Sequence, residues 1–197
     1  MDDALTIYPL VLVRFNSRAL ALEFTILTAA RSGEVLGARW NEIDFGQKVW
    51  TVPAARMKGG REHRVPLSSR ALAVLKKLDA ARTGEYVFSG QRPGRPLSGM
   101  AMEMILRRMK ADNTTVHGFR SSFRDWCGEV STFPCEVAEA ALAHVAGDQT
   151  ERAYRRGDAL EKRRALMEAW ANHCEPKAGN IVAGIDRGGR HGWPKSE

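Results

Sequence analysis

The sequence predicts a mainly α-helical domain with a small antiparallel β-sheet near its N-terminal third. Most segments repeat apolar residues with helical spacing. One stretch, KVWTVPAARMKGGREHRVPLS (residues 48–68), instead concentrates strand-forming residues around a glycine pair. With 197 residues, the chain suits one domain with a substantial core.

The first expected helix covers residues 18–30, which are apolar nearly all round and should be buried. A short second helix over residues 32–40 should begin with Ser32 as its N-cap. Residues 1–18 form an unassigned N-terminal segment. They make a poor signal peptide, because two aspartates and no basic residues precede the apolar stretch.

The stretch rich in strand formers predicts two short strands joined by a turn at Gly59-Gly60. A helix with Ser68 as its cap and leucines on one face should follow over residues 68–82. Residues 86–89, YVFS, are a candidate short strand, and the Gly- and Pro-rich stretch after them is a loop.

The C-terminal half predicts helices over residues 98–112, 116–130, 134–145 and 158–175. The second of these should turn Phe119, Phe123, Trp126 and Cys127 toward the core. The last should begin with Asp158 as its cap and Glu161 three residues later. Residues 176–197 are Gly-rich and unpatterned, which predicts a flexible tail.

Composition narrows the class of partner. The net charge of +7 and the pI near 9.7 fit a surface that binds a polyanion, although a basic protein of another kind fits them equally well. Three cysteines without a C-x-x-C pair argue against a disulfide framework or a zinc ribbon, and favour a reduced cytoplasmic compartment. No apolar run is long enough for a membrane span.

Six polar residues are candidates for chemistry, although each taken alone has an ordinary structural explanation. A helix-end arginine, a hairpin lysine or a packed tyrosine is common in proteins without a site. Together they make a set suited to metal-independent phosphoryl transfer, because guanidinium groups match phosphate oxygens, imidazoles move protons and a tyrosine hydroxyl can attack phosphorus. They are Arg31, Lys58, His117, Arg120, His144 and Tyr154.

The stretches that hold these residues carry a resemblance. LTAARSGEVLGARWNEID, WTVPAARMKGGREHRVPLS, VHGFRSSFRDW, EAALAHVAGDQTERAYRR and EKRRALMEAWANH occur in the order seen in the tyrosine recombinases. The chain resembles their catalytic domain, in the prophage and genomic-island integrase branch, over residues 19–175. Each motif is weak by itself, but five in the same order are a specific signal.

The resemblance implies a role for each matching position. Arg31 stands at the first catalytic arginine with Glu34 as its supporting acid, and Lys58 at the hairpin lysine. His117 and Arg120 fill the H-x-x-R motif. His144 and Tyr154 stand at the second histidine and the nucleophile.

The same resemblance implies a reaction and a partner. Tyr154 would attack a phosphate of double-stranded DNA and form a 3′-phosphotyrosyl link, with Lys58 protonating the leaving oxygen and His117 acting on the tyrosine proton or orienting the phosphate. No metal or other cofactor is needed. The protein would act as a homo-tetramer on DNA, with a monomer possible in its absence, in the bacterial cytoplasm at the nucleoid.

A group of arginines around Tyr154 could hold the duplex through its phosphates. Arg152, Arg155 and Arg156 are the first candidates, and Arg163 and Arg164 are further ones, with a solvated charged face as the alternative. Family members carry an N-terminal domain that clamps the DNA. The short residues 1–18 therefore raise the expectation that the chain is a fragment of a longer integrase.

Three alternatives remain at this stage. The chain could be a catalytically silent DNA-binding remnant, or a type IB topoisomerase-like enzyme that relaxes DNA without site choice. A metal-dependent nuclease has little support, because the carboxylates are scattered without metal-site spacing.

Overall fold

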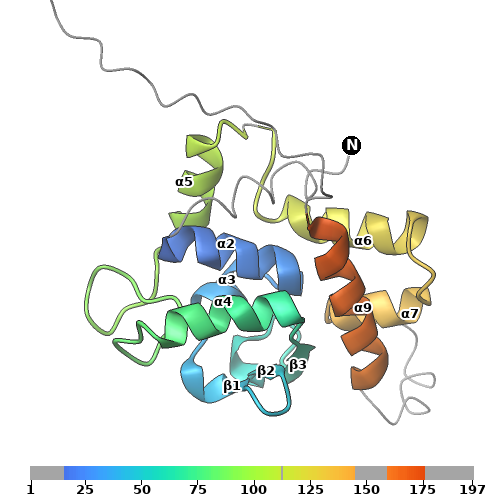
Figure 1. Ribbon diagram of the computed structural model, residues 1–197, viewed down its shortest axis with the longest axis horizontal. Coiled ribbons are helices and arrows are strands. Elements are labelled where there is room, and N and C mark those ends of the chain that lie inside the picture. Colours follow the sequence, from blue (N-terminus) through green and yellow to red (C-terminus); the bar gives the residue numbers. More distant parts are fainter. Residues whose placement is uncertain (1–15, 112, 145–158, 176–197) are drawn as a thin grey trace, which may run out of the picture.

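The computed structural model describes residues 16–111, 113–144 and 159–175 (Figure 1). The expected class, mainly helical with a small antiparallel sheet, is confirmed. The described elements are α2 (Ser17–Thr28), α3 (Ser32–Leu36), β1 (Ile43–Asp44), β2 (Val49–Val52), β3 (His63–Pro66), α4 (Ser69–Asp79), α5 (Ala101–Arg108), α6 (Gly118–Glu129), α7 (Cys135–Ala141) and α9 (Leu160–Cys174). Several predictions fall outside the described residues: those for 1–15, for Arg152, Tyr154, Arg155, Arg156 and Asp158, and for the tail at 176–197.

The three strands form one antiparallel sheet in the order β1-β2-β3. Trp50 on β2 lies opposite Val65 on β3, so the predicted hairpin is confirmed, with a short 3₁₀ turn at Ala54–Arg56 in its connection. Sequence reasoning missed β1, which has only two residues. The strand expected at 86–89 is wrong: Tyr86 forms one isolated bridge to Arg39, and Ser89 forms another to a residue of the next loop.

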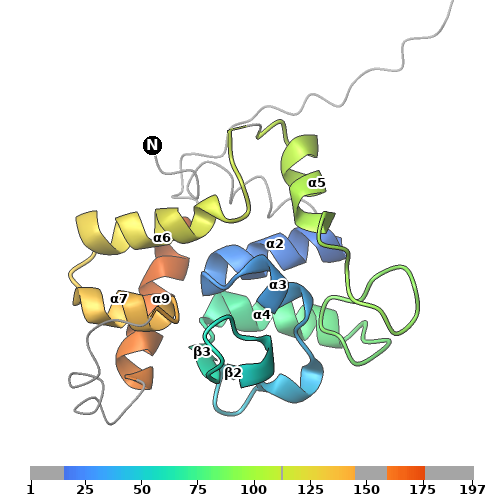
Figure 2. The same cartoon turned by 180° about the vertical axis from the view of Figure 1, so that it is seen from behind.

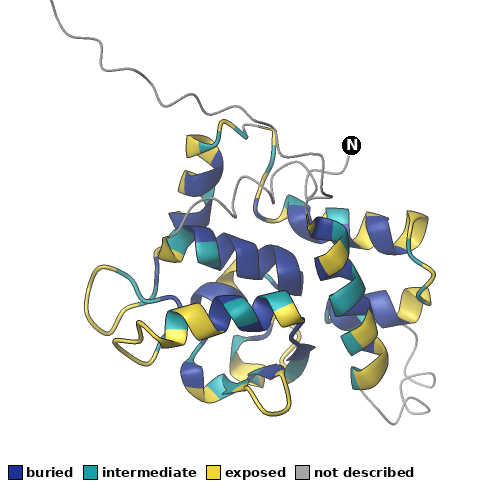
Figure 3. Ribbon diagram, in the orientation of Figure 1, coloured by how far each residue is buried: buried dark blue, intermediate teal, exposed yellow. Residues whose placement is uncertain are grey.

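Helix α2 is the centre of the core. Figure 3 shows it buried along most of its length, and α3, α4, α5 and α9 all contact it. On one side Phe24 packs against Trp50 of the sheet at 5.5 Å between ring centroids, and against Phe88 at 5.6 Å. Burial of each such side chain stabilises the fold by about 1.5–3 kcal/mol.

Helices α6, α7 and α9 form the second part of the core, beside the sheet (Figures 1 and 2). Trp170 of α9 is fully buried, meets Phe123 of α6 edge-on at 5.4 Å, and donates from Nε1 to the carbonyl oxygen of Ile26 at 2.8 Å. The predicted core face of α6 is confirmed, since Phe119, Phe123, Trp126 and Cys127 are all buried. Trp170 therefore joins the C-terminal helix to the central one.

Arg163 corrects an expectation. It was a candidate for DNA contact or for a solvated face, yet only 1% of it is exposed. Its Nη1 donates at 2.7 Å to the carbonyl oxygen of Arg64, so this arginine connects α9 to β3. Its neighbour Arg164 is ion-paired with Glu161 at 3.0 Å.

Helix caps agree with the sequence in part. Ser68 caps α4, accepting from the amide of Ala71 at 3.3 Å. The expected cap at Ser32 is wrong, because Arg31 holds the N-cap position and Ser32 is already helical. The N-cap position of α9 belongs to Ala159 and not to Asp158, because the helix begins at Leu160 and Ala159 before it adopts a left-handed conformation.

Two global expectations can be compared with the described residues. The three cysteines are free, and two of them are buried. Among the described helices, none combines the length and the apolar character that a membrane span needs.

Candidate active site

The turn between α2 and α3 positions Arg31. Ala29 adopts a left-handed conformation, φ 48°, which ends α2, and Arg31 follows in an extended conformation. Glu34 accepts from the backbone amide of Arg31 at 3.0 Å and from its Nη1 at 2.8 Å. Glu34 is buried while part of Arg31 stays exposed, so the carboxylate holds the guanidinium from the protein side and leaves its outer edge open.

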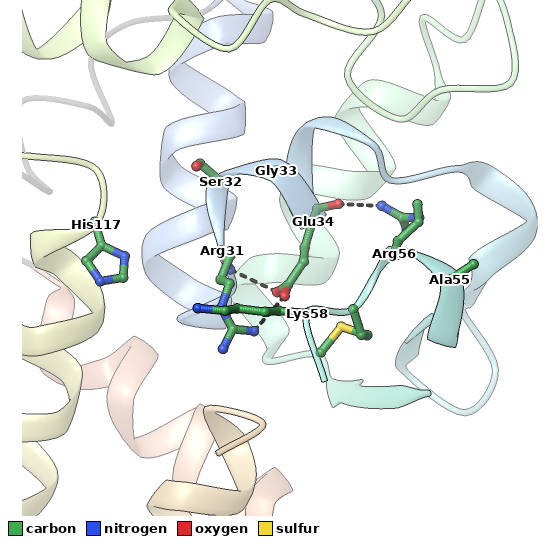
Figure 4. Close-up of a pocket in the computed structure, with 9 residues that line it drawn as sticks. Arg31, Ser32, Gly33, Glu34, Ala55, Arg56, Lys58 and His117 are labelled. Atoms are coloured by element: carbon green, nitrogen blue, oxygen red, sulfur yellow. Dashed lines mark hydrogen bonds and ion pairs between the residues drawn. The ribbon is translucent and has the colours of Figure 1, made fainter. Parts of the chain in front are cut away.

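The loop between β2 and β3 brings Lys58 to the same place. In Figure 4 Lys58 extends from this loop in the direction of Arg31 and Glu34. Two residues earlier, Arg56 donates from Nη1 to the carbonyl oxygen of Glu34 at 2.9 Å. Its Nη2 donates to the carboxylate of Glu42. The loop is therefore attached to α3 directly before the lysine.

Helix α6 supplies the H-x-x-R pair. His117 holds the N-cap position and is exposed, whereas Arg120 lies one turn into the helix and is 7% exposed. Arg120 donates from Nη1 to the carbonyl oxygen of Ala29 and from Nη2 to that of Leu142 at 2.9 Å. One guanidinium thus joins the end of α2, the start of α6 and the end of α7.

Burial and the charge of Arg31 lower the pKa of the Arg120 guanidinium to about 10, against the pull of Glu34 and Glu139. The group keeps its proton at neutral pH, and the field of Arg31 acts on it directly. Two cations held close together in a partly buried place repel each other, and an anion between them relieves that repulsion.

His144 follows α7. Its Nδ1 lies 2.7 Å from Oε2 of Glu139, and its Nε2 lies 3.4 Å from Nη2 of Arg120. The ring is partly exposed. His144 therefore borders Arg120 on the side away from the core.

These elements surround a pocket of about 480 Å³ (Figure 4). Its lining includes three of the predicted residues, Arg31, Lys58 and His117, together with Glu34. Arg120 and His144 do not line this pocket but contact each other, and the field that Arg31 exerts on Arg120 relates them to it. The sixth predicted residue, Tyr154, lies outside the described residues.

Sequence reasoning missed three residues of this region. Arg56 stands two positions before Lys58, but nothing in the pattern separates it from the other hairpin cations. Glu139 stands five residues before His144, a spacing that does not share a face on a continuous helix. The two meet because α7 ends at Ala141 and Ala143 adopts a positive φ of 52°.

The third missed residue is His63 of β3. Its Nε2 lies 3.2 Å from the carbonyl oxygen of Ala141, which connects the hairpin to the end of α7. Burial, and next the charge of Arg163, lower the pKa of the His63 imidazole to about 4. The ring is therefore neutral at physiological pH, with its Nε2 proton donated to the carbonyl.

The described residues suggest no metal centre. Across residues 16–111, 113–144 and 159–175, no group of three or more His, Cys, Asp or Glu side chains could hold a metal ion. The lining instead gathers cations that suit a phosphate or another oxyanion.

A helical domain with a small sheet, and arginine, lysine and histidine side chains gathered at its surface, define a class of protein that acts on phosphate esters. Residues 14–161 match the profile of the phage integrase family, and the chain belongs to that family. It is 40% identical over 174 residues to prophage integrase IntA of Escherichia coli strain K12, covering 86% of this chain and 42% of that protein. It is 31% identical over 182 residues to the integrase of Enterobacteria phage P4, covering 83% of this chain and 42% of that one. The chain spans less than half the length of these relatives.

Solved structures show the same fold. A lambda integrase (75-356) dimer bound to a COC′ core site superposes with a TM-score of 0.55 at 24% identity, covering 74% of this chain and 56% of that chain. A lambda integrase tetramer bound to a Holliday junction gives 0.55 at 23% identity, covering 77% of this chain and 46% of that one. The fold is thus that of a tyrosine recombinase catalytic domain.

Proposed function

We propose that this chain is the catalytic domain of a site-specific DNA recombinase, covering residues 19–175, that cleaves and rejoins strands through a 3′-phosphotyrosyl intermediate. One observation carries the proposal most directly: Arg31, Lys58 and His117, which are far apart in the sequence, line a single pocket. The integrase family and the tyrosine recombinase fold support it.

The cleavage step follows from these groups. The oxygen of Tyr154 attacks phosphorus and the bond to the 5′-oxygen breaks, so one phosphodiester replaces another. Arg31, Arg120 and His144 donate to the non-bridging oxygens, and each such donor is worth about 2.7–4 kcal/mol in the transition state. Lys58 gives a proton to the leaving oxygen, while the tyrosine proton passes to a base, for which His117 is the imidazole at the pocket. Neither metal nor nucleotide enters this balance.

Rejoining is the reverse reaction with a different strand. A 5′-hydroxyl of a partner duplex attacks the phosphotyrosyl bond, and the tyrosine leaves with its proton restored. We infer that four copies on DNA carry out the paired exchanges that integrate or excise a mobile element at the bacterial chromosome. The lambda integrase neighbours, a dimer and a tetramer on DNA, support this assembly. Arg152, Arg155 and Arg156 would contact the phosphates of the duplex near Tyr154.

A covalent capture assay tests the proposal on DNA of any sequence. A pool of duplexes with randomised sequence and a nick beside the cleavage position is incubated with the protein in EDTA, and adducts that resist SDS are recovered and sequenced. We expect adducts enriched in one sequence, and none with Tyr154→Phe. DNA binding without adduct would indicate a silent remnant.

The same assay separates the enzymatic alternatives. Adducts without sequence enrichment, with relaxation of an arbitrary supercoiled plasmid, would indicate topoisomerase-like activity. Cleavage that EDTA abolishes would indicate a metal-dependent nuclease and overturn the proposed mechanism.

A further inference from the structure

A carboxylate outside the predicted set contacts the imidazole of His144. Glu139 of α7 places Oε2 at 2.7 Å from Nδ1 of His144, and its carbonyl oxygen accepts from the backbone amide of His144 at 2.9 Å. Glu139 thus holds the histidine at both its ring and its backbone. With two fixed points, the ring has little freedom to rotate.

The chemistry of the neighbours assigns the proton on this ring. A carboxylate only accepts, so the proton between Glu139 and His144 lies on Nδ1. On the other side, Nη2 of Arg120 lies 3.4 Å from Nε2. A guanidinium only donates, so Nε2 presents its lone pair there. The ring is held as the Nδ1–H tautomer, and Nε2 is the nitrogen that borders the site.

The carboxylate is itself fixed in orientation. Its other oxygen, Oε1, accepts from Nε of Arg124 at 3.0 Å. The Arg124 side chain is 63% exposed, so this ion pair adds little stability. Its effect is geometric, because it leaves Oε2 as the oxygen directed at the imidazole.

We propose that Glu139 is a positioning residue that acts through His144, holding the proton on Nδ1 so that Nε2 addresses the scissile phosphate. This rests on the proposed function and deepens it. When a phosphate binds, Nε2 takes a proton from water and donates it as a hydrogen bond to a non-bridging oxygen. The ring is then a cation between two anions, Glu139 and the phosphate. A carboxylate that fixes an imidazole and stabilises its charged form plays the same part in serine hydrolases.

A double-mutant cycle tests whether Glu139 acts through His144. The rate of adduct formation is measured in a single turnover at saturating DNA for the 197-residue protein, for Glu139→Ala, for His144→Ala and for the double variant. We expect Glu139→Ala to lower the rate by about 10–100-fold, the range found when a residue behind a functional histidine is removed. In the His144→Ala background it should cause no further loss.

Glu136→Ala is the matched control, since Glu136 is an exposed carboxylate in the first turn of the same helix. It should keep the wild-type rate. Equal losses from Glu139→Ala with and without His144 would show a role in folding or packing and overturn the proposal. A Glu139→Ala rate equal to wild type would overturn it as well.

A second measurement holds even if the wild-type protein forms no adduct. Nitrogen-15 NMR of labelled histidine reports which ring nitrogen carries the proton, and His144→Ala assigns the signal. We expect Nδ1 protonated and Nε2 unprotonated in the wild-type neutral ring, and a mixture of tautomers in Glu139→Ala. An unprotonated Nδ1 in the wild type, or the same spectrum in both proteins, would overturn the positioning role. A missing adduct with the expected spectra would instead count against the proposed function.

Discussion

Arg56 donates from Nη1 to the carbonyl oxygen of Glu34 at 2.9 Å, and so joins the loop that carries Lys58 to the helix that follows Arg31. The acceptor of its other contact, Glu42, also accepts from Nε1 of Trp50 at 3.1 Å. The loop is therefore attached both to the α2–α3 turn and to the sheet. These two attachments also place Lys58, which stands only two residues further on.

The first prediction concerns Arg56→Met, which keeps the length of the side chain and removes its donors. We expect cleavage of an ordinary DNA substrate to fall by about 10²-fold, because a displacement of about 1 Å of a reacting group has this effect. A substrate with sulfur in place of the leaving 5′-oxygen needs no proton donor, since a thiolate leaves readily. On it, most of the loss should disappear, as measured by single-turnover adduct formation.

Two further variants calibrate that result. Lys58→Ala should show the same selective rescue by the sulfur substrate, because it removes the proposed proton donor itself. Arg31→Ala should be impaired on both substrates, because it removes a phosphate contact. If Arg56→Met is equally impaired on both, Arg56 supports the phosphate contacts and not the lysine.

The second prediction reaches Arg56 through a glycine. A Cβ on Gly37 would lie 2.8 Å from Nη1 of Arg56, which is the flexible end of the side chain and can move. Gly37→Ala should therefore fold, with a free energy of unfolding lower by about 1 kcal/mol for the lost hydrogen bond. Its cleavage defect and its rescue by sulfur should match those of Arg56→Met.

Gly128→Ala is the control for this glycine. Gly128 lies inside α6 with nothing within 4 Å of an added Cβ, so alanine there should raise the free energy of unfolding by about 0.5–1 kcal/mol. Urea unfolding followed by circular dichroism measures both variants. Wild-type cleavage by Gly37→Ala would show that the Arg56–Glu34 contact does not position the lysine.

The helices and the hairpin could be predicted because they depend on local patterns. The apolar run that forms α2, the serine before α4 and the glycine pair after β2 each specify their element within a few residues. Arg163 could not be predicted, because its burial depends on the carbonyl oxygen of Arg64, which is distant in sequence. Burial of an arginine against a backbone oxygen leaves no periodic trace.

The site shows the same division. Positions such as Arg31 and Lys58 were found from motifs, and the structure brings them to one pocket. The contacts that hold them were not found. Glu139 reaches His144 only through a left-handed residue after α7, and Ala143, which adopts it, is not a residue type that signals such a turn.

The third prediction is a pH dependence of stability that arises from His63. Its pKa is about 4 in the folded protein and 6.5 ordinarily, owing to burial and then to Arg163. Below pH 6.5 the unfolded chain binds a proton that the folded one refuses until about pH 4. The free energy of unfolding should therefore fall as pH drops through this window, by about 2–3 kcal/mol.

His63→Gln tests this assignment, because the amide can still donate to the carbonyl oxygen of Ala141 but does not titrate. We expect a flatter pH dependence between 4 and 6.5 in urea unfolding. His117→Gln, at an exposed histidine, should leave the slope as in the wild type. An unchanged slope in His63→Gln would assign the acid sensitivity to other groups.

The last prediction compares lysine substitutions at the two arginines. Arg120 donates to the carbonyl oxygens of Ala29 and Leu142 with different nitrogens, and a lysine amine cannot reach both. Arg120→Lys should therefore lose about 1–3 kcal/mol of unfolding free energy for the buried carbonyl left without a donor. It should also lose about 10²–10³-fold in cleavage rate.

Arg31→Lys provides the contrast. Part of Arg31 is exposed and its carboxylate partner is next in the same turn, so a lysine should keep much of that ion pair. We expect a comparable loss of cleavage with little change in the urea midpoint. Equal stability of the two variants would mean that the carbonyls held by Arg120 find other donors, and that Arg120 serves the phosphate alone rather than joining three helices as well.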